Sequence, residues 1–311
     1  MDRDRDHGRA VRGPVDAVPQ TRLALSTAVV VPARDAGATL PALRAALAAQ
    51  DLREPCEVVV VDDAAGAGPG AARNEGVARC SADVLAFTDA DCVPEPGWLR
   101  AGLAALAAGA DVVQGRVVPA EPPGPFDRTV SVPGLTHLYE TANLFVRRAW
   151  FERAGGFEPW LSPADGKELA EDAWLGARLA RAGARVAFAP DAVVRHAVER
   201  RGAAAFVRER ARLVHFPQIA ARIPELRERR FHRRVFLSPR SAAFDLALAG
   251  IATRRPLLAA AAALPYARLV AAEARGWGPL APRVGAAGIA ADAVGLGALA
   301  LGSLRARSVL L

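Results

Sequence analysis

The sequence has little lysine and little cysteine, and its first residues hold no apolar stretch of signal-peptide length. Lys167 is the only lysine, so the net charge of +7 comes almost wholly from arginine. Arginine suits bidentate recognition of phosphate, although an Ala- and Arg-rich genome would also explain its frequency. The three cysteines are odd in number and lack metal-ligand spacing, which argues against a disulfide framework and fits a reducing compartment. Residues 1–22 are charged and contain two prolines, and we expect a disordered tail on the cytosolic side.

The C-terminal part lacks an uninterrupted run of roughly 20 strongly apolar residues, the usual mark of a transmembrane helix. Residues 242–304 are nevertheless dominated by Ala, Leu, Val and Gly. Three interpretations stay open: weak transmembrane helices, an interfacial hairpin, or a soluble helical subdomain. The arginines of residues 200–240 fit an anionic surface, so we favour association with the cytoplasmic face of the cell membrane. These arginines have no aromatic stacking platform between them, so nucleic acid is not an expected partner.

Apolar, β-branched segments alternate with segments of helical spacing over the first half of the chain. The expected strands are 28–32, 57–61, 84–87 and 111–118, and the expected helices are 39–52, with Thr39 as N-cap, 71–80 and 98–108. After a Pro- and Gly-rich loop we expect strand 143–146, helices from 148 and from 171, and strands 185–188 and 192–196. This alternation predicts an α/β fold with a doubly wound, mostly parallel sheet, in which ligands bind beyond the carboxyl ends of the strands.

Two pairs of aspartates lie at predicted strand ends. Asp89 and Asp91 are separated by one residue, and strand geometry sends such side chains to the same side. A divalent cation with oxygen ligands would relieve their repulsion, although such pairs are also common in turns. Asp62 and Asp63 end the preceding strand, where a carboxylate suits the imino N–H of uracil or guanine; capping of the next turn is the alternative. His196, at a later strand end, is either an ordinary hydrogen-bonded histidine or a ligand of metal or phosphate.

Three further patterns have both a structural and a functional interpretation. Glu171 and Asp172 open a predicted helix, where the macrodipole stabilises acids, but where a carboxylate can also face a cleft as a catalytic group. Arg73 lies either on a solvated helix face or against the strand ends, where it would contact a nucleotide. Residues 66–71 match the dinucleotide fingerprint G-x-G-x-x-A, yet the two aspartates before them would repel a pyrophosphate.

Taken in order, seven motifs resemble those of glycosyltransferase family 2, whose members have the GT-A fold. The motifs are VVVPARD (29–35), VVVVDD (58–63), ARNEG (72–76), FTDAD (87–91), GGF (155–157), EDAWL (171–175) and a segment that runs from APD to His196 (189–196). The resemblance covers about residues 27–215. It implies a GT-A catalytic domain at 23–235, followed at 236–311 by an Ala-rich, helical and hydrophobic region that we expect to associate with the membrane.

On the donor side the resemblance implies a role for each matching residue. Asp63, with Asp62 beside it, would hold the base of a UDP- or GDP-sugar, and Arg73 would support the nucleotide. Asp91 would coordinate Mn²⁺ or Mg²⁺ on the diphosphate, and Asp89 would lie near the ribose and the metal. The further candidates are Pro32 and Asp35 in the donor pocket and His196 at the metal.

On the acceptor side the resemblance makes Asp172 the general base for the acceptor hydroxyl, and one base without a covalent intermediate implies inversion. The further candidates are Gly156, Phe157, Trp160 and Glu171. The expected activity is metal-dependent, inverting transfer of a sugar from a nucleotide sugar to a hydroxyl of a glycan or lipid-linked acceptor. Two other classes stay open: a dinucleotide- or nucleotide-dependent enzyme of Rossmann-like type, and a non-catalytic nucleotide-sugar-binding module.

Two departures from the family pattern touch the donor pocket. The first strand ends in Arg34-Asp35-Ala36, where the family usually has Tyr-Asn-Glu. The turn after Asp63 reads Ala64-Ala65-Gly66 in place of the usual Gly-Ser. Both departures leave the choice of nucleotide open.

Overall fold

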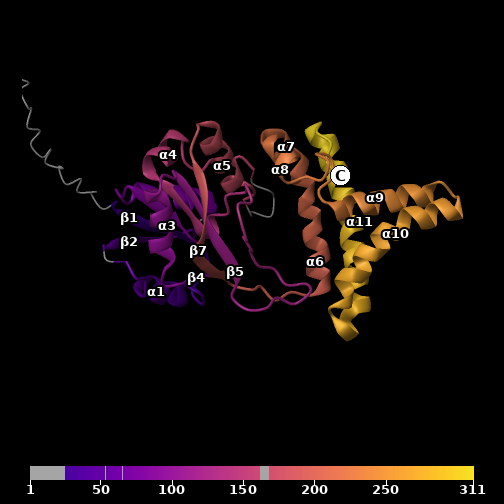
Figure 1. The fold of residues 1–311 in the computed structure, drawn as a ribbon, viewed down its shortest axis with the longest axis horizontal. Helices are drawn as coiled ribbons and strands as arrows, with labels where there is room; N and C mark the ends of the chain where they lie inside the picture. Colours follow the sequence, from indigo (N-terminus) through magenta and orange to yellow (C-terminus); the bar gives the residue numbers. More distant parts are fainter. Residues whose placement is uncertain (1–24, 53, 65, 162–167) are drawn as a thin grey trace, which may run out of the picture.

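The computed structural model describes residues 25–52, 54–64, 66–161 and 168–311. The chain has a part built around a β-sheet and, after it, a part built of helices (Figure 1). The expected tail at 1–22 lies outside the described residues. Nothing tests the expected boundary at residue 235, which stays a prediction.

The sheet contains seven strands within the described residues, in the order β2-β1-β3-β6-β5-β7-β4. Their bounds are β1 Thr27–Ala33, β2 Cys56–Asp62, β3 Val84–Phe87, β4 Cys92–Pro94, β5 Val112–Pro119, β6 Leu144–Arg147 and β7 Val186–His196. The pairs β1–β2, β1–β3 and β5–β7 are parallel, and β3–β6, β5–β6 and β4–β7 are antiparallel. The α/β prediction is confirmed, and the sheet is mixed because β6 runs against both of its neighbours.

Two details of the sheet differ from the sequence prediction, and both affect the site. The two short strands expected at 185–188 and 192–196 form one strand, β7, whose register with β5 shifts between Gly115 and Arg116. The buried Asn143 spans this irregularity, since its side-chain amide donates to the Arg116 and Ala192 carbonyls at 2.8 Å each. The other difference is β4, a three-residue strand that the sequence did not predict and that pairs with the end of β7.

Helices flank the sheet (Figure 1). They are α1 Leu40–Ala48, α2 Pro69–Ala78, α3 Trp98–Ala107, α4 Arg148–Arg153 and α5 Glu171–Arg181. Thr39 occupies the N-cap position of α1 as predicted, but its hydroxyl lies 3.4 Å from the Ala36 carbonyl and caps no helix N–H. Burial of β1 and β3 fixes the position of the strand ends, since Val29, Val31 and Phe87 are fully inaccessible to solvent.

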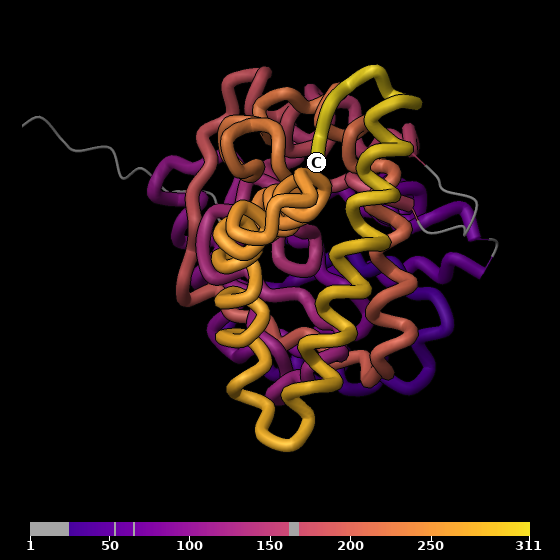
Figure 2. Tube along the Cα trace, turned by 90° about the vertical axis from the view of Figure 1, so that its right-hand side faces the viewer, coloured from indigo at the N-terminus to yellow at the C-terminus, as the bar shows by residue number. Residues whose placement is uncertain are grey.

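The C-terminal part is built mainly of helices, as predicted. It contains α6 Ala203–Glu209, η2 Arg210–His215, α7 Phe216–Arg222, α8 Glu225–Arg229, α9 Pro239–Ala252, α10 Pro256–Arg275, η3 Gly278–Leu280 and α11 Ala281–Ala306. Helix α11 packs against α6, η2 and α7, while α9 and α10 form an arm that projects away from the sheet (Figure 1). Figure 2 shows α10 and α11 joined at one end by the turn around η3.

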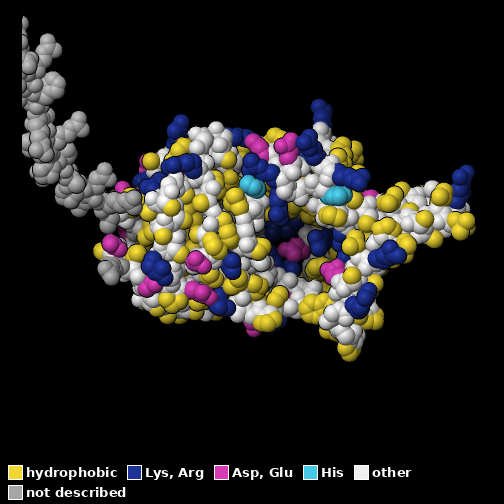
Figure 3. Space-filling view, in the orientation of Figure 1, with side chains coloured by type: hydrophobic (Ala, Val, Ile, Leu, Met, Phe, Trp, Pro, Cys, Tyr) yellow, Lys and Arg dark blue, Asp and Glu magenta, His cyan; other side chains and the backbone are white. Residues whose placement is uncertain are grey.

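One charged cluster connects the three long C-terminal helices. Arg240 on α9 donates from Nε to the Asp292 carboxylate on α11 at 2.8 Å, and the Tyr266 hydroxyl on α10 donates to the same carboxylate at 2.6 Å. Large apolar side chains nevertheless remain exposed on the arm; Leu257, for example, is 85% exposed. By length and composition, α10 and the segment of residues 278–306 are able to cross a membrane. Figure 3 shows the arm as largely apolar on the face drawn.

Candidate active site

A cleft of about 900 Å³ lies beyond the carboxyl ends of β1 and β3, where the sequence predicted it. Nine carboxylates and three arginines among the described residues line it. In Figure 3 the molecule is hollowed between the sheet and the C-terminal helices, and acidic and arginine side chains surround the hollow. The cleft is therefore strongly acidic, although the chain as a whole is basic.

One corner of the cleft brings together Asp89, Asp91, Cys92 and His196. One ligand atom from each of these four residues lies within 4.8 Å of the others. Asp89 and Asp91 follow β3, while the pairing of β4 with β7 places Cys92 opposite His196. Sequence reasoning proposed three of these four residues, and the unpredicted strand β4 explains how His196 reaches the aspartates.

The side chains in this corner suit a divalent cation. The His196 Nδ1 lies 2.8 Å from the Ala197 carbonyl, which can only accept a hydrogen bond, and Nε2 lies 3.6 Å from the Asp91 carboxylate. Burial, with Asp89 nearby, raises the pKa of Asp91, which a bound cation would reverse. Burial also raises the pKa of the Cys92 thiol, so it keeps its proton. Two carboxylates and an imidazole are a donor set that fits a divalent cation such as Mn²⁺, and the carboxylates also suit Mg²⁺.

Arg73 connects this corner to the opposite wall. Its residue is 3% exposed, and its guanidinium donates from Nη2 to Asp89 at 2.7 Å and pairs through Nη1 with Glu171 at 3.4 Å. The same guanidinium lies 5.5 Å above the centre of the Phe157 ring. Burial alone would lower the pKa of Arg73, but the two carboxylates raise it, so the side chain stays charged. The solvated-face interpretation of Arg73 is therefore wrong.

The opposite wall begins where α5 begins. Ala170 precedes the helix in the left-handed region, at φ 59°, a conformation that costs energy for a residue with a Cβ. Glu171 is 9% exposed and pairs with Arg73, whereas Asp172 has no cation within ion-pair distance among the described residues. Burial and the charge of Glu171 raise the pKa of Asp172 well above its ordinary value, although the Ala173 N–H donates to its carboxylate at 2.7 Å. Asp172 is thus a carboxylate poised to take a proton.

The corner of the cleft at the ends of β1 and β2 is where we expected the nucleotide base, and we call it the base corner. It contains one of the two aspartates expected there. Asp63 is 7% exposed and lines the cleft, and its Oδ2 accepts from the Gly68 N–H at 3.1 Å. It therefore caps the turn and faces the cleft at once. Asp62 is exposed at the end of β2 and does not line the cleft. Pro32 and Asp35 line the cleft as expected.

Three residues expected on the acceptor side do not line the cleft: Gly156, Phe157 and Trp160. The Phe157 backbone exchanges two hydrogen bonds with the Asn74 side chain, at 2.7 and 2.9 Å, so this turn is anchored to α2. The Gly156 carbonyl accepts from Arg178 at 2.5 Å. Gly156 has a φ of 69°, and a Cβ there would meet the Asn74 side chain at 2.8 Å. Gly156 and Phe157 thus connect this turn to α2 and α5.

Sequence reasoning missed five charged residues that line the cleft: Arg34, Arg128, Glu140, Glu168 and Glu199. Glu168 accepts from the Gly70 N–H at 2.9 Å, through Oε2, and burial raises its pKa. Only Arg34 had a sequence signal, because it stands where the family pattern has another residue. The others come from loops, whose path no periodicity predicts.

The Gly-rich turn does not behave as a dinucleotide site. The N–H groups that would face a pyrophosphate are already bound to carboxylates, Gly68 to Asp63 and Gly70 to Glu168. Two anions beside the start of α2 would repel a third. The fingerprint match is therefore a coincidence of glycine spacing.

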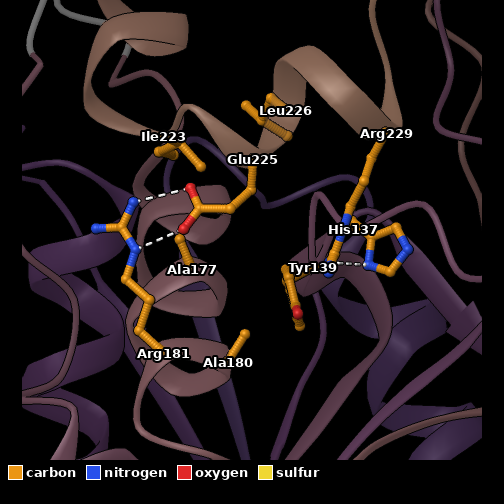
Figure 4. Close-up of a pocket in the computed structure, with 9 residues that line it drawn as sticks. All are labelled: His137, Tyr139, Ala177, Ala180, Arg181, Ile223, Glu225, Leu226 and Arg229. Carbon is orange, nitrogen blue, oxygen red and sulfur yellow. Dashed lines mark hydrogen bonds and ion pairs between the residues drawn. The ribbon is translucent and has the colours of Figure 1, made fainter.

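A second cavity, of about 170 Å³, lies between α5, α8 and the segment around His137 (Figure 4). Arg181 donates to both oxygens of Glu225, at 2.7 and 2.8 Å. On the other side Arg229 lies 2.9 Å from the His137 Nδ1, and burial together with Arg229 lowers the pKa of that ring. None of the residues proposed from the sequence lines this cavity. The larger cleft is therefore the candidate active site.

Two family models match the chain. Residues 64–157 match the model "Glycosyl transferase family 2", and residues 136–227 match "Glycosyl transferase family 21". The chain is 29% identical over 158 residues to the pre-mycofactocin glycosyltransferase of Mycobacterium tuberculosis, covering 45% of this chain and 32% of that protein. It is 33% identical over 112 residues to glycosyltransferase AglE of Haloferax volcanii, covering 32% of this chain and 36% of that protein. The chain thus spans about a third of the length of these curated relatives.

Among solved structures, the fold is similar to that of the mannosyltransferase PcManGT from Pyrobaculum calidifontis, determined in complex with GDP-Man and Mn²⁺. The TM-score is 0.57 at 22% identity, and the match covers 92% of this chain and 91% of that one. This likeness confirms the GT-A fold expected from the motifs. The family models and the curated relatives support a glycosyltransferase of the family 2 type over the residues that they match, while the solved structure shows the likeness of the fold.

Proposed function

We propose that this chain transfers a sugar from a nucleoside-diphosphate sugar to a hydroxyl of a glycan or lipid-linked acceptor, with Mn²⁺ or Mg²⁺ and with inversion. One observation carries the proposal: Arg73 pairs with both Asp89 and Glu171. The proposed metal corner and the helix that bears Asp172 are therefore two walls of one cleft. A donor bound at the first wall would present its sugar to the second.

The charge of the cleft supports metal dependence. Nine carboxylates and three arginines line it, so a nucleoside diphosphate would meet strong repulsion without a cation. Asp89, Asp91 and His196 would hold the ion, which would offset the charge of the leaving diphosphate. The solved mannosyltransferase, which contains GDP-Man and Mn²⁺, is consistent with this assignment.

Asp172 is the proposed general base. It would take the proton of the acceptor hydroxyl while that oxygen bonds to the anomeric carbon and the bond to the diphosphate breaks. The raised pKa of Asp172 suits this transfer, because a stronger base is the better acceptor of the proton. No second carboxylate is required as a nucleophile, so the configuration at the anomeric carbon inverts.

We also propose that the C-terminal helices bring the cleft to a membrane surface, on its cytoplasmic face. Within α10 the most apolar window is only 11% buried, so most of its surface has no protein partner among the described residues. Exposed leucines on α9 and α10 would enter the apolar phase, and neighbouring arginines would meet anionic lipid headgroups. A lipid-linked acceptor would then lie near the cleft.

A panel of nucleotide sugars, with and without Mn²⁺, tests the transferase proposal through release of nucleoside diphosphate. We expect release with one donor class, dependent on the metal, and loss of release in Asp91→Asn. Asp191→Asn is the matched control, because Asp191 is exposed on β7 outside the cleft. Metal-independent release at the full rate would refute the metal assignment. Sedimentation with phosphatidylglycerol vesicles tests the membrane proposal. We expect the chain to sediment with the vesicles, and a chain that stays in the supernatant would contradict the proposal.

Two other functions fit the cleft less well. A dinucleotide enzyme needs free N–H groups at the start of α2, and two carboxylates already bind them. A non-catalytic sugar-nucleotide module has no need for a half-buried carboxylate of raised pKa opposite the donor wall. Donor binding without any transfer to a range of acceptors would favour the module.

A further inference from the structure

The base corner of the cleft presents one anion and one cation side by side. Asp63 follows β2, and Arg34 follows Ala33 at the end of β1, which pairs with β2 through Ala33 and Asp62. A Cβ built on Gly66 would lie 3.6 Å from both Nη1 and Nη2 of Arg34. The guanidinium therefore lies over the turn that begins at Asp63. Both side chains line the cleft.

Asp63 is a fixed hydrogen-bond acceptor. Its Oδ2 accepts from the Gly68 N–H at 3.1 Å, and its carbonyl accepts from the Gly66 N–H at 3.0 Å. A carboxylate offers about four lone-pair positions, so one protein N–H leaves room for two donors from a ligand. Uracil offers one N–H at its pairing edge, whereas guanine offers N1–H and the N2 amino group together. Asp63 alone would accept either base.

Arg34 supplies what Asp63 does not. It is exposed, and no carboxylate of the described residues lies at ion-pair distance from it. A guanidinium carries a planar set of donors that matches two acceptors on one edge, and guanine O6 and N7 form such an edge. Uracil has no pair of adjacent acceptors, and adenine offers an amino donor beside N7. Cytosine has the acceptors N3 and O2 side by side, but it offers Asp63 only one donor group, the N4 amino group, where guanine offers two.

We propose that Asp63 and Arg34 select guanine, so that the donor is a GDP-sugar. The proposal rests on the proposed function, because it names the base of the nucleotide at that same site. Guanine would place N1–H and the N2 amino group against Asp63, and O6 and N7 toward Arg34. Arg34, which departs from the family pattern, would then set the specificity for the nucleotide base.

Calorimetric binding of nucleoside diphosphates to the full chain with Mn²⁺ tests this assignment. We expect GDP to bind at least about tenfold more tightly than UDP, ADP or CDP, since one bidentate contact discriminates by roughly that much. Inosine diphosphate, which lacks the N2 amino group, should bind about tenfold more weakly than GDP. The analogue 7-deaza-GDP, which lacks N7, should also bind about tenfold more weakly than GDP.

The variant Arg34→Ala separates base recognition from contact with the diphosphate. We expect this variant to bind GDP about tenfold more weakly and to bind UDP with an affinity within about threefold of the original. It should also bind 7-deaza-GDP as tightly as it binds GDP. Arg44→Ala on α1, an exposed arginine outside the cleft, should change none of these values. Equal weakening of all four diphosphates in Arg34→Ala would overturn the proposal, and so would tighter binding of UDP than of GDP. Failure of every diphosphate to bind would overturn the proposed function itself.

Discussion

Replacing Asp172 by asparagine should make the protein more stable and inactive at once. The residue is half-buried beside Glu171, and desolvation together with the charge of Glu171 raises the pKa of its carboxylate well above the ordinary value of 3.8. A raised folded-state pKa means that the stability associated with this group is present below pH 4 and is lost as pH rises through the folded-state pKa. Asp172→Asn keeps the shape and removes the charge, so its advantage should be absent near pH 4 and grow toward pH 8.

The size of the effect follows from the surroundings of the side chain. Burial of an unpaired charge beside a second carboxylate costs on the order of 1–3 kcal/mol, which corresponds to a rise in melting temperature of roughly 2–8 °C for a domain of this size. The neighbouring substitution Glu171→Gln should lower the stability of the protein rather than raise it. It removes a partner of the buried Arg73, 3.4 Å away, and should lower stability by about 1–2 kcal/mol.

Thermal unfolding between pH 4 and pH 8 measures the stability change, while donor binding and sugar transfer measure function. Transfer in Asp172→Asn should fall by a factor of about 10² to 10⁴, the usual contribution of a general base, with donor binding retained. Full transfer in this variant would refute the role of Asp172. A lower melting temperature at pH 8 than that of the unmodified chain would refute the argument from burial.

Three other substitutions test separate parts of the structure. Arg73→Met leaves two carboxylates unpaired, and because Asp89 is 28% exposed we expect a loss of about 2–4 kcal/mol in urea unfolding, below the usual upper range. His196→Ala should weaken Mn²⁺ binding at least about tenfold, as followed by electron paramagnetic resonance, and an unchanged affinity would exclude it as a ligand. Gly102→Ala places a Cβ 2.3 Å from the Phe145 ring, so we expect about 1–3 kcal/mol of destabilisation in thermal unfolding, and a neutral result would contradict the tight packing of α3 on β6.

The sequence predicted the elements whose apolar residues either form a continuous run or repeat with a regular period. β3 was predicted at its observed bounds, because four consecutive apolar residues between polar segments favour a fully buried strand. The acids at strand ends were predicted for the same reason, since the end of a buried strand fixes where the next polar side chain lies. Asp63, Asp89 and Asp91 all reach the cleft.

The features that the sequence did not predict depend on contacts between distant segments. Strand β4 has only three residues and exists because β7 pairs with it. Glu168 binds the Gly70 N–H across 98 positions of sequence, which no local pattern encodes. Phe157 matched a family motif, but the motif did not reveal that its backbone holds Asn74 rather than a ligand.

The position of Arg73 has a consequence for engineering. A single guanidinium joins α2, the segment after β3 and the start of α5, which are far apart in the sequence. The part of the domain that carries Arg73 and Asp89 and the part that begins at Glu171 are therefore not interchangeable modules. A chimera that takes one half from another protein would separate Arg73 from at least one of its carboxylates, unless the donor sequence supplies a matching acid. Recombination to obtain new specificities should keep Arg73, Asp89 and Glu171 together as one inherited unit.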